Sequence, residues 1–220
     1  MPRYFCTKIN TMKNIGVLIS LLLFVHVPEV SWGLKDQTDT IAQQPTQVLI
    51  VGLHDNVKSN YYYDEMIAKE TGMQADSIDH YYNRIIATNI ISATPNGACR
   101  FITANDQTCL KLAEKIAVHG EGENCTSDLN KVSQEELQQL LSHTHSEYLL
   151  VLNQHYLKWQ EKPMRTLFHI ISYTLYNKEK KQIYTGNQFF TAMKLESPER
   201  ITQISRKSSS KIASAITKAL

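Results

Sequence analysis

The chain has 220 residues, of which 42% are hydrophobic, and it carries 23 basic and 21 acidic side chains. This length fits one domain and is tight for two. The near balance of charge excludes a protein that binds nucleic acid or anionic membranes through a global excess of positive charge. Four cysteines without a C-x-x-C pair are too few for a scaffold that depends on disulfides.

The most apolar stretch lies near the start of the chain, over residues 15–27. Its thirteen residues are too few for a helix that spans a bilayer, which needs about 20. Lys13 precedes the run, Pro28 ends it, and small residues then stand at positions −3 and −1 of a cut before Leu34. This layout predicts a secretory signal peptide over residues 1–33, and the alternative is an uncleaved amphipathic anchor.

Removal of the signal peptide would leave 187 residues with balanced charge. Residues 34–46 are polar and predict a flexible leader, which a single domain over 47–220 follows. Three cysteines remain in this part, Cys99, Cys109 and Cys125. One disulfide could form among them in an oxidising compartment, and the sequence leaves the pair open.

The first half of the predicted domain opens with a strand and two helices. The apolar, β-rich run QVLIVGL at 47–53 predicts a strand buried on both faces. Residues 59–72 predict a short helix that ends at Gly72. The β-branched content of 77–92 favours a strand, but its length and the N-cap residue Ser77 decide for a helix.

A turn at 95–97 and a strand at 98–104 are predicted next. They are followed by a helix at 107–118, a loop at 119–130 and a second helix at 133–143. Asp106 is the predicted N-cap of the first of these two helices. Ser133 and Glu136 form the S-x-x-E pattern of a capping box and predict the start of the second.

The last third carries three β-rich runs, at 147–157, 166–177 and 182–192. A short charged turn, KEKK, joins the second and third, which predicts an antiparallel hairpin with the first run as neighbour. His169 falls on the same face of the second run as its apolar residues, because side chains alternate along a strand.

A final helix is predicted from Ser197, with Pro198 at its first position and Glu199 in its first turn. A continuous, mostly apolar stripe of residues along this helix is typical of a helix packed on a sheet. The stripe comprises Ile201, Ile204, Ser208, Ile212, Ile216 and Ala219.

This order of elements predicts a single α/β (α+β) domain. We expect a mixed sheet of about five strands, with a C-terminal antiparallel part of three strands and helices packed on the sheet. The portion HSEYLLVLNQHYL…TLFHIISYTLYNKEKKQIYTG, within residues 47–219, resembles a domain of bacterial envelope proteins. These are the TolB amino-terminal domain, the curli-secretion lipoprotein and the lipoprotein activators of penicillin-binding proteins. The resemblance implies protein–protein contact in the envelope without catalysis.

Aromatic residues are the first candidates for binding. Tyr61, Tyr62 and Tyr63 are consecutive, so at least one must point outward on any regular element. Trp159 ends a predicted strand. Tyrosine and tryptophan are favoured at the centres of protein interfaces, although packing into the core is their commoner fate.

A second candidate lies at the carboxyl end of the first strand, where His54, Asp55 and Asn56 follow the apolar run. Ligands bind at such ends in open α/β sheets. The alternative is an ordinary exit from a strand, where Asp and Asn terminate extended structure.

Metal and thiol chemistry have weaker signals. His143 and His145 form an H-x-H pair, which suits zinc or copper on a strand, but a histidine at a helix end also suits the helix dipole. Cys109 and Cys125 with His119 lack the local signature of a thiol enzyme. We therefore expect no cofactor and no metal.

The function expected from the sequence is that of an exported envelope accessory protein, periplasmic or secreted, which binds another protein or a cell-wall complex without catalysis. It would bind no nucleic acid and have no transmembrane span. The alternatives are a small-molecule-binding periplasmic protein and a hydrolase or metal-dependent enzyme that uses His54, Asp55, His143 and His145.

Overall fold

The structure is a computed structural model that describes residues 45–93, 99–104 and 106–220. The predicted signal peptide, nearly all of the leader and the turn at 95–97 lie outside these residues, so they stay predictions.

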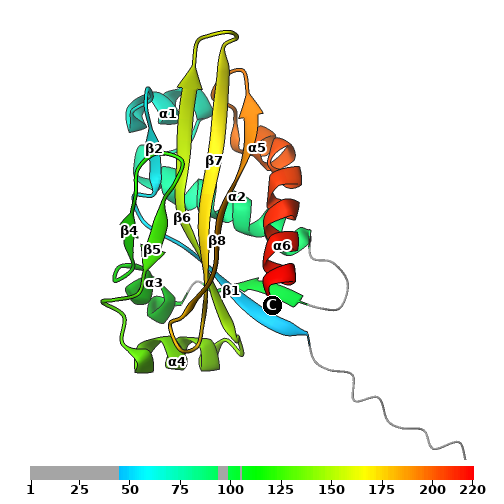
Figure 1. The fold of residues 1–220 in the computed structure, drawn as a ribbon. Helices are drawn as coiled ribbons and strands as arrows, with labels where there is room; N and C mark the ends of the chain where they lie inside the picture. Colours follow the sequence, from blue (N-terminus) through cyan, green and yellow to red (C-terminus); the bar gives the residue numbers. More distant parts are fainter. Residues whose placement is uncertain (1–44, 94–98, 105) are drawn as a thin grey trace, which may run out of the picture. The chain divides into compact units, whose positions relative to one another are not determined.

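One mixed sheet of six strands organises the domain (Figure 1). Five of them follow one another in the order β3 (Cys99–Thr103), β1 (Thr46–Gly52), β6 (Tyr148–Gln160), β7 (Thr166–Asn177) and β8 (Gln182–Ala192). The short β2 (Val57–Ser59) pairs with the second half of β6. β1 runs parallel to β3 and β6, whereas β6, β7 and β8 are antiparallel. The predicted fold class is confirmed.

The helices cover both faces of the sheet, and Figure 1 shows α5 and α6 on one side and α3 and α4 toward the other. The first face carries α2 (Ile78–Ser92), α5 (Pro198–Ile204) and α6 (Arg206–Ala219). The second carries α3 (Gln107–Ala113), α4 (Gln134–His143) and the two-stranded sheet of β4 (Ala117–His119) and β5 (Thr126–Asp128). A short helix, α1 (Asp64–Thr71), and a 3-10 turn at Ala75–Ser77 precede α2. Among the described residues, no helix combines the length and apolarity needed to cross a membrane.

Alternation along the central strands builds two apolar layers. Val48 and Ile50 of β1 face α2 and α6, whereas Leu49 and Val51 face α3 and α4. All four side chains are at most 2% exposed. The strand that was predicted to be buried on both faces therefore separates the two parts of the core.

Three predicted helix N-caps are confirmed, and one of them is Ser197, which accepts from the backbone N–H of Arg200 (3.5 Å) with Pro198 at the first position of α5. Asp106 accepts a hydrogen bond from the backbone N–H of Cys109 (2.7 Å), and Ser133 and Glu136 form the complete capping box of α4. Ser77 stands at the N-cap of α2 as predicted, but its hydroxyl donates to Asp76 and caps nothing.

Three predicted bounds were wrong. The helix predicted over 59–72 begins only at Asp64, because the hydroxyl of Ser59 holds the N–H groups of the next residues in a turn. The helix predicted to reach 118 ends at Ala113, and the loop predicted over 119–130 contains a strand. Gly120 (φ 102°) and Gly122 (φ 57°) have left-handed backbone conformations. They allow the chain to reverse between β4 and β5, so that the two strands pair.

The final helix is divided where a single helix was predicted. Ser205 is buried at the junction of α5 and α6, and its hydroxyl donates to the carbonyl of Ile201 (2.7 Å). The same hydroxyl accepts from Asn89 of α2 (2.9 Å). A serine that bonds back to its own helix bends the helix, and this bend lets both halves pack on α2.

Candidate functional site

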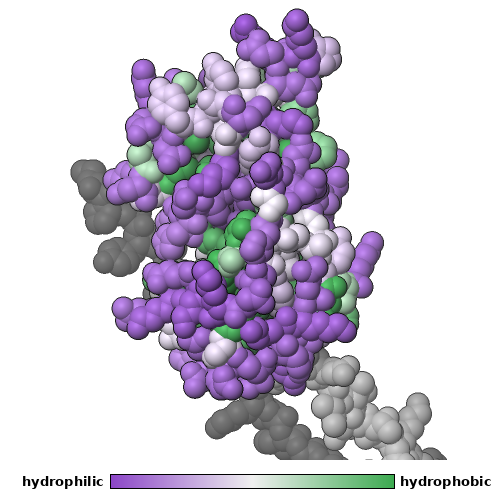
Figure 2. All heavy atoms as spheres, turned by 60° about the vertical axis from the view of Figure 1, so that its left-hand side comes forward, coloured by the Kyte–Doolittle hydropathy of each residue, from purple (hydrophilic) through white to green (hydrophobic). Residues whose placement is uncertain are grey.

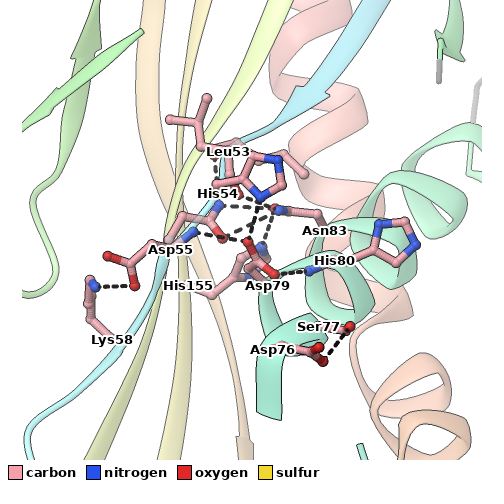
Figure 3. Close-up of polar contacts among 12 residues, drawn as sticks. Leu53, His54, Asp55, Lys58, Asp76, Ser77, Asp79, His80, Asn83 and His155 are labelled. Atoms are coloured by element: carbon pink, nitrogen blue, oxygen red, sulfur yellow. Dashed lines mark hydrogen bonds and ion pairs between the residues drawn. The ribbon is translucent and has the colours of Figure 1, made fainter. Parts of the chain in front are cut away.

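The carboxyl end of β1 is held by a network of polar side chains, shown in Figure 3. The chain leaves β1 at Gly52, where a Cβ atom would lie 2.4 Å from Cγ of Asn83. Only glycine therefore allows Asn83, from α2, to reach across the end of the strand. Its amide donates to the carbonyl of Leu53 (2.9 Å).

Asn56 completes this bridge between the loop, α2 and the sheet. Its amide donates to Oδ1 of Asn83 (3.0 Å) and to the carbonyl of Leu152 (3.1 Å). Nε2 of His155, from β6, lies 3.3 Å from the same Asn83 oxygen. Asn56 is 4% exposed, so the sequence-predicted residue acts as an internal tie and does not line an open pocket.

Asp79, in the first turn of α2, binds the two remaining residues of the loop. Its carboxylate accepts from the backbone N–H groups of Asp55 (2.9 Å) and His80 (2.7 Å). Nδ1 of His54 lies 3.3 Å from the same carboxylate, and the His54 ring is exposed. Among the described residues, no hydroxyl or thiol is hydrogen-bonded to His54.

Two imidazoles lie in the apolar layer under α2. His155 and His169 are each 2% exposed, and the ring of Tyr82 lies 5.6 Å from the first and 6.0 Å from the second. The ring of Phe190 stacks on His169 at 4.5 Å. Burial lowers the pKa of both histidines to about 3, so both are neutral at physiological pH.

A cleft of about 280 Å³ opens beside this network, between α2 and α3. Its walls include Leu53, Ala87 and Leu110, and its rim includes His54 and Arg84. Figure 2 shows the side of the domain that carries α1, β2 and α3, where apolar surface lies in hollows between hydrophilic ridges.

The histidines considered for metal binding do not meet. His54 follows the carboxyl end of β1, whereas His143 and His145 precede the amino end of β6, which runs parallel to β1. His143 lies 3.4 Å from the Asp106 carboxylate, and His145 has a left-handed backbone (φ 51°). In the described part of the chain, no group of three or more His, Cys, Asp or Glu side chains is arranged to hold a metal.

The three cysteines of the described residues are buried free thiols. Cys99 and Cys109 belong to the apolar layers on opposite faces of the sheet. Burial, with a smaller effect of the Asp106 carboxylate, raises the pKa of Cys109 to about 11, which makes it a poor nucleophile. Cys125 lies 3.1 Å from the side-chain oxygen of Gln154.

The tyrosines and the tryptophan singled out from the sequence do come together. Tyr61, Tyr62 and Trp159 form what we call the aromatic cluster, with ring centroids 5.0 to 6.1 Å apart. Asn60 fixes the two segments, 99 residues apart, since its side chain donates to the Trp159 carbonyl (3.0 Å) and accepts from the Trp159 N–H (2.7 Å). The sequence indicated the aromatic residues but not Asn60. The partner of Asn60, Trp159, becomes known only from the pairing of β2 with β6.

The aromatic cluster faces solvent in part. Tyr61 is 58% exposed and the neighbouring Tyr63 is 60% exposed, whereas Tyr62 and Trp159 are half-buried. A groove of about 400 Å³ adjoins the cluster, and its lining consists of Tyr62, Tyr63, Glu65, Met66, Lys69, Glu70, Lys194 and Leu195. None of these charged residues was singled out from the sequence.

No protein-family model matches this chain, and a search of curated proteins found no match. Solved structures that are similar to it include three bacterial proteins. The hypothetical protein CT253 from Chlamydia trachomatis has 9% identity and a TM-score of 0.48, and the match covers 79% of this chain and 96% of that chain. Lipoprotein GNA1162 from Neisseria meningitidis has 10% identity and a TM-score of 0.37, with 79% of this chain and 96% of that chain covered. The LpoB C-terminal domain from Salmonella enterica has 9% identity and a TM-score of 0.30, with 66% of this chain and 82% of that chain covered. The resemblance predicted from the order of the elements is thus found again between structures. At these identities and TM-scores it concerns the arrangement of the elements alone.

Proposed function

We propose that this protein is an accessory protein of the bacterial cell envelope that binds another protein through its aromatic cluster. The observation that carries the proposal is the cluster itself: three rings from distant segments in mutual contact, with Tyr61 58% exposed at the surface. If the three rings were fully buried they would need no further partner, but here the Tyr61 ring is largely in water.

The cluster has the properties of an interface centre. Tyrosine and tryptophan bury much apolar area at a small cost in side-chain entropy, and they dominate binding energies at interfaces. The double hydrogen bond between Asn60 and Trp159 holds the platform in place before a partner arrives, which lowers the cost of binding. The groove beside it offers charged side chains such as Lys69 and Glu70, which suit the polar rim of an interface.

The location rests on the predicted signal peptide over residues 1–33. The order of its charged start, apolar run and small-residue exit supports export to the periplasm or beyond the cell. An exported binding protein meets partners in the envelope, either single proteins or complexes that act on the cell wall.

The test is a pull-down from envelope extract with crosslinking and quantitative mass spectrometry. The double variant Tyr61→Ala/Tyr63→Ala removes two exposed rings without opening the core. We expect it to lose at least tenfold of one protein that the wild type captures. The control is Val118→Ala, which truncates an exposed apolar side chain (39%) of β4 on the other face of the sheet.

Equal capture by the wild type and the double variant would contradict docking through the cluster. Equal loss in the Val118→Ala control would show that the capture depends on apolar surface in general. Circular dichroism of all three proteins establishes that the comparison is between folded chains.

A second candidate function is the binding of a small molecule, which the cleft between α2 and α3 favours because it lies at the carboxyl ends of β1 and β3. Thr88 is exposed and lines this cleft, so Thr88→Trp would fill it. Native mass spectrometry of protein purified from envelope extract should then show a bound molecule in the wild type and none in the variant.

A further inference from the structure

β8 is an edge strand, and no described strand pairs with its outward side. It is the last strand in the order β3-β1-β6-β7-β8 and pairs with β7 alone. Apart from this ladder, its backbone makes no hydrogen bond to any described residue. Eleven residues in extended form leave an open edge of about 37 Å, at roughly 3.4 Å per residue.

The sequence of this edge lacks the usual protection against pairing. QIYTGNQFFTA contains no charged residue and no proline over its whole length. Soluble proteins blunt their edges with lysine, proline, short strands or bulges, because unpaired N–H and C=O groups are a template for another strand. The only irregularity in the ladder lies at its start, opposite Leu175 and Tyr176. The opposite edge, β3, has five residues and an exposed Arg100.

We propose that β8 pairs with β8 of a second copy of this chain, antiparallel and about a two-fold axis at Asn187. Asn187 is the midpoint of the strand and is exposed, and its amide donates to the carbonyl of Glu123 in the loop between β4 and β5 (3.2 Å). The equimolar mixture of charged variants described below separates the loss of this bond, which both variants share, from repulsion at the axis. The two sheets would join into one continuous sheet. This pairing concerns a surface separate from the aromatic cluster and does not depend on the proposed function.

The register centred on Asn187 matches the side chains of the strand to each other. Tyr184 of one copy lies opposite Phe190 of the other, and Thr185 lies opposite Phe189. Aromatic pairs and pairs of an aromatic with a β-branched residue are the favoured cross-strand neighbours. Phe189 is 59% exposed, with Phe168 of β7 as its ring neighbour at 6.0 Å, and a strand beyond the edge would cover it.

Charge favours a second copy over an unrelated strand. The turn 178–181 before β8 has the sequence KEKK and a net charge of +2, whereas residues 193–199 after it have a net charge of −1. Antiparallel pairing places the turn of one copy beside the exit segment of the other, with Lys178 opposite Glu196 and Lys180 opposite Lys194. The net charges of the two segments remain of opposite sign. Within the strand itself, no register brings like charges together.

The experiment measures the mass of the full chain in solution by light scattering and analytical ultracentrifugation at micromolar concentrations. Asn187→Lys and Asn187→Asp each place a charge on the two-fold axis, where it would face its own copy. We expect the wild type to be a dimer and each variant alone to be at least tenfold weaker in self-association. An equimolar mixture of the two variants should form the dimer again, because opposite charges then meet at the axis.

The control is Ser142→Lys, which adds the same charge at an exposed position of α4. It should leave the dimer intact, as should Tyr61→Ala/Tyr63→Ala. A monomeric wild type would overturn the proposal. A dimer that survives both charged variants, or a mixture that fails to associate, would also overturn it, as would an open series of larger assemblies.

Discussion

His155 and His169 are the residues whose surroundings differ most from those of the same side chains in water. Both lie between the sheet and α2 in a layer of apolar side chains. Neither ring nitrogen of His169 has a hydrogen-bond partner among the described residues. A protonated imidazole here would be a buried charge without a counter-charge in contact, which is why burial lowers the pKa of both groups to about 3.

This predicts a loss of stability in mild acid. In the unfolded chain each histidine takes up a proton below its usual pKa of about 6.5, but in the folded chain it stays neutral until about pH 3. The stability that their neutral forms provide is complete above about pH 6.5 and falls as the pH drops toward 3. In this window, each histidine should lower the free energy of unfolding by up to about 1.4 kcal/mol for each unit that the pH falls.

Urea unfolding of the wild type and His169→Phe at pH 7.0, 5.5 and 4.5 checks this prediction. Phenylalanine fits between Tyr82 and Phe190 and does not titrate, so the variant should lose about half of the slope. The control is His145→Asn, which changes an exposed histidine to a residue that tolerates its left-handed backbone. An unchanged slope in His169→Phe would refute the assignment.

At the scale of elements, one buried polar side chain joins α2 to the last two helices, in addition to their apolar packing. The amide of Asn89 donates to the carbonyl of Thr202 (2.8 Å) and to the hydroxyl of Ser205 (2.9 Å). These two bonds join the middle of α2 to the point where the final helix bends. Asn89 is buried, so water cannot replace them.

Asn89→Ala should therefore lower the free energy of unfolding by about 2 kcal/mol, since it removes two hydrogen bonds, one of them to the buried hydroxyl of Ser205. Amide hydrogen exchange in α5 should increase more than in α4, which has no contact with Asn89. Ser92→Ala, an exposed serine of the same helix, should change stability by less than about 0.5 kcal/mol. Equal effects of the two substitutions would show that the bend is held by packing alone.

At the scale of the whole domain, the two apolar layers are joined through the central strands. β1 and β6 supply alternate residues to both layers, so neither layer can lose its packing while the other keeps its strands. The described residues from 45 onward should therefore unfold as one cooperative unit.

Calorimetry of Leu140→Ala in α4 and Ile86→Ala in α2 tests this. Both side chains are 0% exposed, one in each layer, and each truncation should cost about 2–5 kcal/mol. Both variants should shift one common transition to lower temperature, whereas the exposed neighbour Gln139→Ala should not move it. Two separate transitions, each sensitive to one variant, would contradict a single unit.

Much of the fold could be predicted from local signals because the physical causes are local. Asp106 and the Ser133–Glu136 pair cap the helices that follow them, and alternation in 166–177 placed His169 on the inner face. The strands β4 and β5 were missed because they are three residues long and exist only by pairing with each other. The division at Ser205 was missed because a serine inside a helix does not by itself predict a bend, and Asn89, which binds its hydroxyl, is 116 residues away.

The candidate sites divide in the same way. The sequence alone determined that Tyr61, Tyr62 and Tyr63 could not all be buried, and that His54 and Asp55 follow a buried strand, since both statements rest on chain neighbours. Only the tertiary structure decided that Trp159 packs on Tyr61, that Asp79 holds His54, and that β8 ends the sheet with an open edge. The physical reason is that side-chain partners across a sheet are set by strand order and register, which join residues far apart in the chain.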